Sequence, residues 1–173
     1  MTPEHQLDPN TLGDHFDRLY RAAWALCGSR QDAEDLVQDT YARVLTRPRI
    51  VRRDDDLGYL LRVLRNTFIS QRRAAARRPQ SSGAEPEALD LPDERRAAAE
   101  PAVAAEAREV YRAIAELPDD FRDALVAVDV AGLSYTEASR ALKVPEGTVT
   151  SRLFRARRQV AQTLAPSEQT GGD

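Results

Sequence analysis

Apolar side chains recur at intervals of three and four residues along most of the chain, a period typical of amphipathic helices. The pattern predicts three helices before residue 79 and four after residue 101, so the expected fold class is all-α. The apolar positions of the first three are Leu12, Phe16, Leu19, Ala23, Leu26 and Cys27, then Ala33, Leu36, Val37, Tyr41, Val44 and Leu45, then Leu60, Leu61, Val63, Leu64, Phe68 and Ile69.

Residues that start or stop helices set the expected boundaries. Gly28 ends the first helix, and Ser29 with Asp32 is a candidate capping box for the second. The third helix is expected from about Leu57 to Arg78, after a loop from Arg47 to Asp56.

The helices after residue 101 are marked in the same way. Pro118 ends the first of them, and Asp119 and Asp120 are expected to cap the second, which Gly132 stops. The apolar positions of these two are Val103, Ala107, Val110, Ile114 and Leu117, then Phe121, Ala124, Leu125 and Val128.

The last two helices lie close together in the sequence. Ser134 and Glu137 form a capping box, in which the hydroxyl and the carboxylate each satisfy a backbone donor, so a helix begins just after Ser134. A short turn at residues 143–144 follows, and Pro145 marks the start of the next helix.

The final helix has one apolar stripe and one face of hydroxyl and guanidinium groups. The stripe is Val149, Leu153, Ala156 and Val160, and the polar face is Thr148, Thr150, Ser151, Arg152 and Arg155. Such a pair of helices matches the helix-turn-helix, whose second helix lies in the DNA major groove, where arginine reads guanine edges and binds phosphates. The alternative is a helical hairpin with a solvated charged face.

Two earlier helices carry charge of opposite sign. Asp32, Asp35 and Asp39 share a face of the second helix beside Gln38, which fits either a solvated surface or a protein interface. The third helix has a basic face, which fits either a nucleic-acid surface or a solvated arginine-rich face. Its members are Arg62, Arg65, Asn66, Ser70, Arg72 and Arg73, followed by Arg77 and Arg78.

A shift in composition divides the chain into four expected segments. These are a helical domain at 1–78, a flexible acidic linker rich in Pro, Ala and Ser at 79–101, a helix-turn-helix domain at 102–165, and a disordered tail at 166–173. Two small domains fit a chain of 173 residues that is 42% hydrophobic.

The composition and motifs argue against several kinds of site and classes of protein. Cys27 is the only cysteine, so an internal disulfide and a cysteine-cluster zinc site are excluded. The sequence has no paired histidines, no glycine-rich phosphate loop and no nucleophile beside a base. We therefore expect that the protein is not an enzyme and that it uses no cofactor, metal or small-molecule substrate. No apolar run approaches ~20 residues and the start is not signal-like, so we expect a soluble cytoplasmic protein without direct membrane insertion.

Four stretches, in this order, resemble extracytoplasmic-function (ECF) sigma factors, the small two-domain sigma subunits of bacterial RNA polymerase. They are DAEDLVQD at 32–39, YLLRVLRN at 59–66, AELP at 115–118, and GLSYTE at 132–137 continued by GTVTSRLFRAR at 147–157. The resemblance runs from about residue 12 to residue 164.

The resemblance implies an alternative sigma factor that directs RNA polymerase to specific promoters and assists promoter opening. It assigns contact with the clamp helices of the polymerase beta-prime subunit to Asp32, Glu34, Asp35, Leu36, Gln38, Asp39 and Tyr41. It assigns the minus-ten element to Arg62, Arg65, Asn66, Ser70 and Arg73, with the loop from Arg49 to Asp56 receiving an unstacked base. It assigns recognition of the minus-thirty-five element to Thr148, Thr150, Ser151, Arg152, Phe154 and Arg155. The polymerase beta flap and an anti-sigma factor are the further implied partners.

Four positions depart from the family pattern. Ser70 replaces a common aspartate or asparagine and Thr150 a common lysine or arginine, both on the presumed base-reading faces. The promoter sequence therefore cannot be carried over from relatives. Tyr59 in place of tryptophan and Ser139 in place of alanine are expected to leave the fold intact.

A conventional helix-turn-helix regulator with an N-terminal ligand or dimerisation domain is the competing interpretation. It accounts for the residues after Leu133. It leaves the acidic helix and the basic helix around Asn66 without a role.

Overall fold

The computed structural model describes residues 4–7, 9–46, 50–52, 55–78 and 101–165, and this part of the chain is mainly helical. The expected tail and nearly all of the expected linker lie outside it, as does part of the predicted loop before the third helix. The helices are α1 (Phe16–Cys27), α2 (Arg30–Thr46), α3 (Asp56–Arg77), α4 (Pro101–Ala115), α5 (Asp119–Leu125), α6 (Tyr135–Leu142) and α7 (Glu146–Leu164), with a 3-10 turn η1 (Leu12–His15) and a π-helical segment η2 (Val126–Val130). The all-α prediction is confirmed.

Most helix ends fall where the sequence places them. The capping box before α6 is complete: the Glu137 amide donates to Ser134 Oγ at 3.2 Å, and the Ser134 amide donates to Glu137 Oε2 at 2.7 Å. Pro145 is the N-cap of α7, and Lys143 turns the chain between α6 and α7 with a φ of 56°. The turn between Lys143 and Pro145 therefore sets the direction in which α7 leaves α6.

Replacing Ser134 with alanine is expected to lower the free energy of unfolding by about 1 kcal/mol, because the amide at the start of α6 loses its acceptor. Chemical denaturation of the full chain measures this change. Glu137→Gln is the matched control, since glutamine also serves in a capping box. Equal losses in both variants would contradict the assignment of the cap to Ser134.

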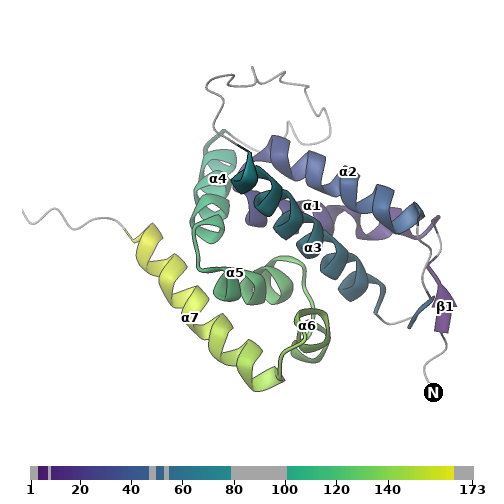
Figure 1. The fold of residues 1–173 in the computed structure, drawn as a ribbon. Helices are drawn as coiled ribbons and strands as arrows, with labels where there is room; N and C mark the ends of the chain where they lie inside the picture. Colours follow the sequence, from purple (N-terminus) through teal and green to yellow (C-terminus); the bar gives the residue numbers. More distant parts are fainter. Residues whose placement is uncertain (1–3, 8, 47–49, 53–54, 79–100, 166–173) are drawn as a thin grey trace, which may run out of the picture.

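The two halves of the chain pack against each other. Figure 1 shows α4–α7 beside the α1–α3 bundle, and α1 contacts both α4 and η2. The rings of Trp24 and Tyr111 stack with centroids 4.5 Å apart, and buried apolar side chains of both halves form one continuous cluster. Gly28, with a φ of 77°, lies so close to α4 that an added Cβ would be 3.1 Å from the Cβ of Ala115.

Several expectations were wrong in detail. Residues Glu4–Gln6 (β1) and Ile50–Arg52 (β2) form a short antiparallel ladder, where the sequence predicted no strand. Phe16 and Leu45, expected on buried stripes, are 46% and 52% exposed. Pro118, without a side-chain cap, is the N-cap of α5, so Asp119 and Asp120 are available for other contacts.

Candidate nucleic-acid interface

The acidic residues of α2 form one exposed face, as their spacing predicts. Asp32, Asp35 and Asp39 line a cavity of about 760 Å³ between the two halves of the molecule, together with Gln38. Arg72 of α3 and Arg122 of α5 line the same cavity. Glu34 is also exposed. The acidic face, defined as Asp32, Asp35 and Asp39, therefore has negative charge at its surface and positive charge across the cavity.

Two residues assigned to this surface have structural roles. Leu36 is fully buried, so its side chain holds α2 in the core instead of facing a partner. Tyr41 is partly buried, stacks on Phe16, and donates a hydrogen bond from its hydroxyl to the Leu12 carbonyl at 2.9 Å. Burial raises the pKa of Tyr41.

Cys27 lines the same cavity as Asp32, Asp35 and Asp39, and its thiol is a poor nucleophile. Burial, followed by the nearby charge of Asp32, raises the pKa of its thiol to about 12. Because the thiolate is the reactive form, a thiol that stays protonated at neutral pH is a poor nucleophile. Its role is to pack, as the sequence indicates.

The basic helix α3 places its polar residues on two sides. Arg62 and Asn66 line a cavity of about 480 Å³ with Tyr59 and with Arg43 of α2. Arg62 Nη2 lies 3.9 Å from Asp55 Oδ2 at the start of the helix. The cavity offers an aromatic ring, an amide and two guanidinium groups, which are the groups that bind an unstacked base and its phosphate. Ser70 is exposed further along α3.

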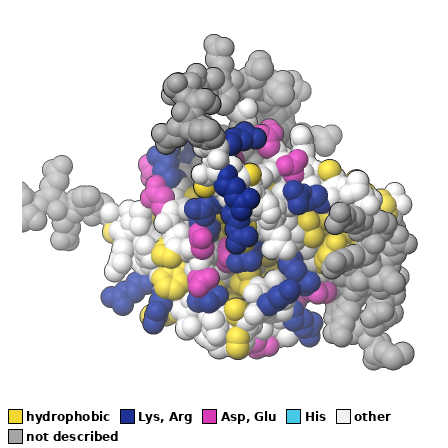
Figure 2. All heavy atoms as spheres, in the orientation of Figure 1, with side chains coloured by type: hydrophobic (Ala, Val, Ile, Leu, Met, Phe, Trp, Pro, Cys, Tyr) yellow, Lys and Arg dark blue, Asp and Glu magenta, His cyan; other side chains and the backbone are white. Residues whose placement is uncertain are grey.

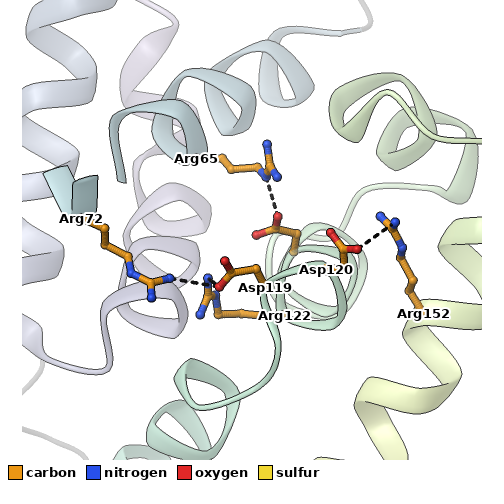
Figure 3. A network of polar contacts seen from close by, with 7 residues as sticks. Arg65, Arg72, Asp119, Asp120, Arg122 and Arg152 are labelled. Atoms are coloured by element: carbon orange, nitrogen blue, oxygen red, sulfur yellow. Dashed lines mark hydrogen bonds and ion pairs between the residues drawn. The ribbon is translucent and has the colours of Figure 1, made fainter. Parts of the chain in front are cut away.

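On its other side, α3 meets α5. Arg65 Nε lies 2.6 Å from Asp123 Oδ2, and Arg72 Nη1 lies 3.0 Å from Asp119 Oδ1 (Figure 3). Asp119 also pairs at 2.6 Å with Arg122, a buried residue whose guanidinium lies over the ring of Phe68. In the face shown in Figure 2, arginine and lysine side chains gather near the middle, with acidic side chains among them.

The environments of the two aspartates differ. Burial acts to raise the pKa of Asp119, but the hydrogen bonds and charges of Arg72 and Arg122 outweigh it and lower that pKa. Asp123 is more deeply buried, and its desolvation raises its pKa despite the charge and hydrogen bond of Arg65. For this carboxylate, desolvation therefore outweighs the stabilisation that Arg65 gives its charged form.

One side of α7 packs against the rest of the protein, and the opposite side is exposed. Val149, Leu153 and Ala156 are buried, as predicted. The Ser139 hydroxyl donates to the Val144 carbonyl at 2.6 Å, so the serine that departs from the family pattern adds a bond to the turn. Arg157 holds Asp129 through two hydrogen bonds of 2.8 and 2.7 Å, which also raise the pKa of Arg157.

The side chains assigned to the minus-thirty-five element lie mostly on the outer face of α7. Thr150, Ser151, Phe154 and Arg155 are exposed, and Thr148 and Arg152 are half-buried. Arg152 Nη2 pairs with Asp120 Oδ2 at 3.0 Å. The helix therefore presents hydroxyls, an aromatic ring and guanidinium groups at the spacing that the sequence predicts.

Asp119, Asp120 and Asp123 make ion pairs that the sequence did not reveal. They form the acidic turn of α5, and each pairs with an arginine of α3 or α7. Two acids after Pro118 look like ordinary helix caps, and partners 47 and 58 residues away leave no periodic signal.

No helix in the described ranges is long and apolar enough to cross a membrane. Within the same ranges, no three His, Cys, Asp or Glu side chains are arranged to hold a metal ion.

Family models match both halves of the chain. The model described as Sigma-70 region 2 matches residues 12–78, and the model described as Sigma-70, region 4 matches residues 107–160. The first match contains α1, α2 and α3, and the second contains α5, α6 and α7 up to residue 160.

Curated relatives and a solved structure agree with these matches. The chain is 36% identical over 157 residues to the ECF RNA polymerase sigma factor SigE of Mycolicibacterium smegmatis, covering 87% of this chain and 59% of the relative. It is 34% identical over 141 residues to the ECF RNA polymerase sigma factor SigC of Mycobacterium tuberculosis, covering 80% of this chain and 74% of the relative. The sigma factor RpoE, solved with the anti-sigma factor NepR from Bartonella quintana, aligns with a TM-score of 0.65 at 25% identity, covering 91% of this chain and 96% of that one.

Proposed function

The chain belongs to the extracytoplasmic-function (ECF) sigma factors of RNA polymerase, and we propose that it directs the polymerase to specific promoters and assists promoter opening. One observation carries the proposal. The part of the chain that matches region 2 has an acidic face and a basic face, and the part that matches region 4 has a helix-turn-helix with an exposed arginine face.

The acidic face of α2 is the proposed contact with the clamp helices of the polymerase beta-prime subunit. Asp32, Asp35 and Asp39 are exposed on firmly packed backbone, since Ala33, Leu36 and Val37 between them are buried. Glu34 and Gln38 extend the same contact. A rigid helix that presents charge favours a partner of complementary potential.

The basic helix α3 is the proposed reader of the minus-ten element. Asn66, in the cavity beside Tyr59, would hold a base that has left the stack, while Arg62, Arg65 and Arg73 would bind phosphates. Ser70 would lie near the bases. Capturing unpaired bases offsets the cost of unstacking them, about a few kcal/mol per step.

The outer face of α7 is the proposed reader of the minus-thirty-five element in the major groove. Two weak DNA contacts on one chain gain affinity through their effective concentration once the polymerase fixes their separation. Arg155, Phe154 and Thr150 are exposed here, and the assignment extends to Thr148, Ser151 and Arg152.

The proposal includes the cellular setting. The protein would act in the cytoplasm as a transcription initiation factor without catalytic activity of its own. It would also bind the polymerase beta flap and be controlled by an anti-sigma factor, the class of partner present in the solved RpoE complex.

Mapping transcript starts after overexpression in the native host tests this function. We expect a set of new start sites preceded by two common sequence elements at a constant spacing. A conventional helix-turn-helix regulator would instead change the level of existing transcripts without creating new starts, and that result would reject the proposal.

Replacing Arg155 with alanine is expected to weaken upstream promoter binding by about 1 to 3 kcal/mol, because an exposed guanidinium of the recognition helix is removed. Titration of promoter DNA with the assembled polymerase measures the loss. Arg108→Ala, at an exposed position of α4, is the matched control and should bind normally. Association with polymerase should not change, and a loss of that association would show that Arg155 has a different role.

A further inference from the structure

The N-terminal strand β1 has no part in the proposed function. It pairs antiparallel with β2, a strand in the connection between α2 and α3, and Figure 1 shows it at the end of the α1–α3 bundle where α3 begins. A segment near the start of the sequence therefore reaches the loop that is expected to receive an unstacked base. The Cα partners in the ladder are Glu4 with Arg52, His5 with Val51 and Gln6 with Ile50.

The loop that contains β2 connects two sides of the proposed base-binding cavity. Arg43, near the end of α2, lines the cavity before the loop, and Tyr59 and Asn66 of α3 line it after the loop. β2 itself contacts α3, and Arg62 Nη2 at the cavity lies 3.9 Å from Asp55 Oδ2, directly before α3. A change in the backbone of the loop therefore occurs beside the cavity.

The strand β1 is anchored to the helical core. Leu7, the residue after β1, is 6% exposed and belongs to the cluster of buried apolar side chains. Leu12 is also buried, and its carbonyl accepts the hydrogen bond from the Tyr41 hydroxyl of α2 at 2.9 Å. The ladder therefore joins β2 to a segment that is itself fixed to the α1–α3 bundle.

A loop whose middle is already paired loses less conformational freedom when it binds a ligand. Ordering the backbone of one residue corresponds to about a tenfold change in an equilibrium constant, and a ligand binds more tightly when it does not have to provide that ordering. Because the ladder consists of main-chain hydrogen bonds, it depends on strand-forming residues in β1 and not on particular side chains. A two-stranded ladder adds little stability by itself, so it can be broken while the helical core stays intact.

We propose that β1 is a brace that holds Ile50–Arg52 in place for single-stranded minus-ten DNA. The brace, Glu4–Gln6, is a positioning element, because it acts through β2 and does not itself read the bases. The inference rests on the proposed function for the identity of the ligand. The brace lies outside both segments that match the family models, so minus-ten recognition depends on residues beyond the matched region 2.

Two variants changed at the same positions of β1 test the brace. His5→Pro/Gln6→Pro breaks the ladder, because successive amides of a strand point to opposite edges and one of the two prolines therefore removes a ladder donor. His5→Val/Gln6→Thr is the matched control, since both replacements favour strands and keep their amides. Hydrogen exchange of the free proteins checks the ladder itself. The amides of residues 50–52 should exchange faster in the proline variant than in the other two proteins.

Binding is measured with assembled polymerase and a labelled single-stranded oligonucleotide that carries the minus-ten element of a mapped promoter. We expect the proline variant to bind it about tenfold more weakly than the unmodified protein, and the control to bind within about twofold. All three should bind a scrambled oligonucleotide of the same length equally, because phosphate contacts do not depend on sequence. A loss limited to the minus-ten strand separates positioning of the loop from a general structural defect.

Three results would overturn the brace. They are equal binding by all three proteins, an equal loss in the control, and an equal loss on the scrambled strand. If circular dichroism shows that the prolines unfold the chain, His5→Gly/Gln6→Gly replaces them, with an expected loss of about threefold. Failure of the proposed function looks different, because the unmodified protein would then bind the minus-ten and scrambled strands alike, which rejects the minus-ten assignment and the brace together.

Discussion

Replacing both Asp35 and Asp39 with arginine is expected to weaken association with core RNA polymerase by about a hundredfold or more. Both side chains are exposed on α2. If the polymerase surface is complementary to the acidic face, arginine at these positions meets positive charge there, and such a like-charge contact costs several kcal/mol. A titration of labelled protein with core polymerase measures the change. Polymerase-free DNA binding should not fall, because the arginines of α3 and α7 are untouched.

The control for this charge reversal is Glu106→Arg/Glu109→Arg on α4, which alters net charge by the same amount at exposed positions. Normal polymerase binding by that control, combined with a large loss in the α2 variant, assigns the contact to the acidic face. Similar behaviour of the two variants would mean that polymerase senses overall charge and that α2 has no dedicated role.

Leu153 and Phe154 are neighbours on α7 with opposite expected roles. Leu153 is 1% exposed, and its replacement by alanine leaves a cavity expected to cost about 3 to 5 kcal/mol of unfolding free energy. Phe154 is 67% exposed, so Phe154→Ala should change stability by no more than about 0.5 kcal/mol while weakening promoter binding. Chemical denaturation and a promoter titration, applied to both variants, separate packing from recognition.

Each of the two variants serves as the other's control. A large loss of stability in Phe154→Ala, or a small one in Leu153→Ala, would mean that the inward face of α7 has been assigned incorrectly. The present assignment depends on Val149, Leu153 and Ala156 all being buried along one stripe.

Local chemistry made the C-terminal helices predictable. The bonds between Ser134 and Glu137 span three residues, and Pro145 can be accommodated only at the start of a helix. Such signals lie within one turn of helix, so the sequence displays them directly. The face of α7 follows from the same 3.6-residue period.

Contacts between the halves were not predictable because they join residues far apart in the sequence. Arg65 appeared as one member of a basic face, and only the packing of α5 against α3 reveals Asp123 as its partner. The expected burial of Phe16 was wrong for a related reason. It lies at the edge of an apolar stripe, where the period alone does not decide between burial and solvent, and the structure leaves it 46% exposed.

Run-off transcription with sigma-free core polymerase and purified protein is the most direct test of the proposed function. The template is a promoter fragment taken from the mapped start sites. We predict one defined start that requires the added protein and is lost with Asp35→Arg/Asp39→Arg. Transcription that starts at random positions, or is the same with and without the protein, would contradict its assignment as a promoter-selecting subunit.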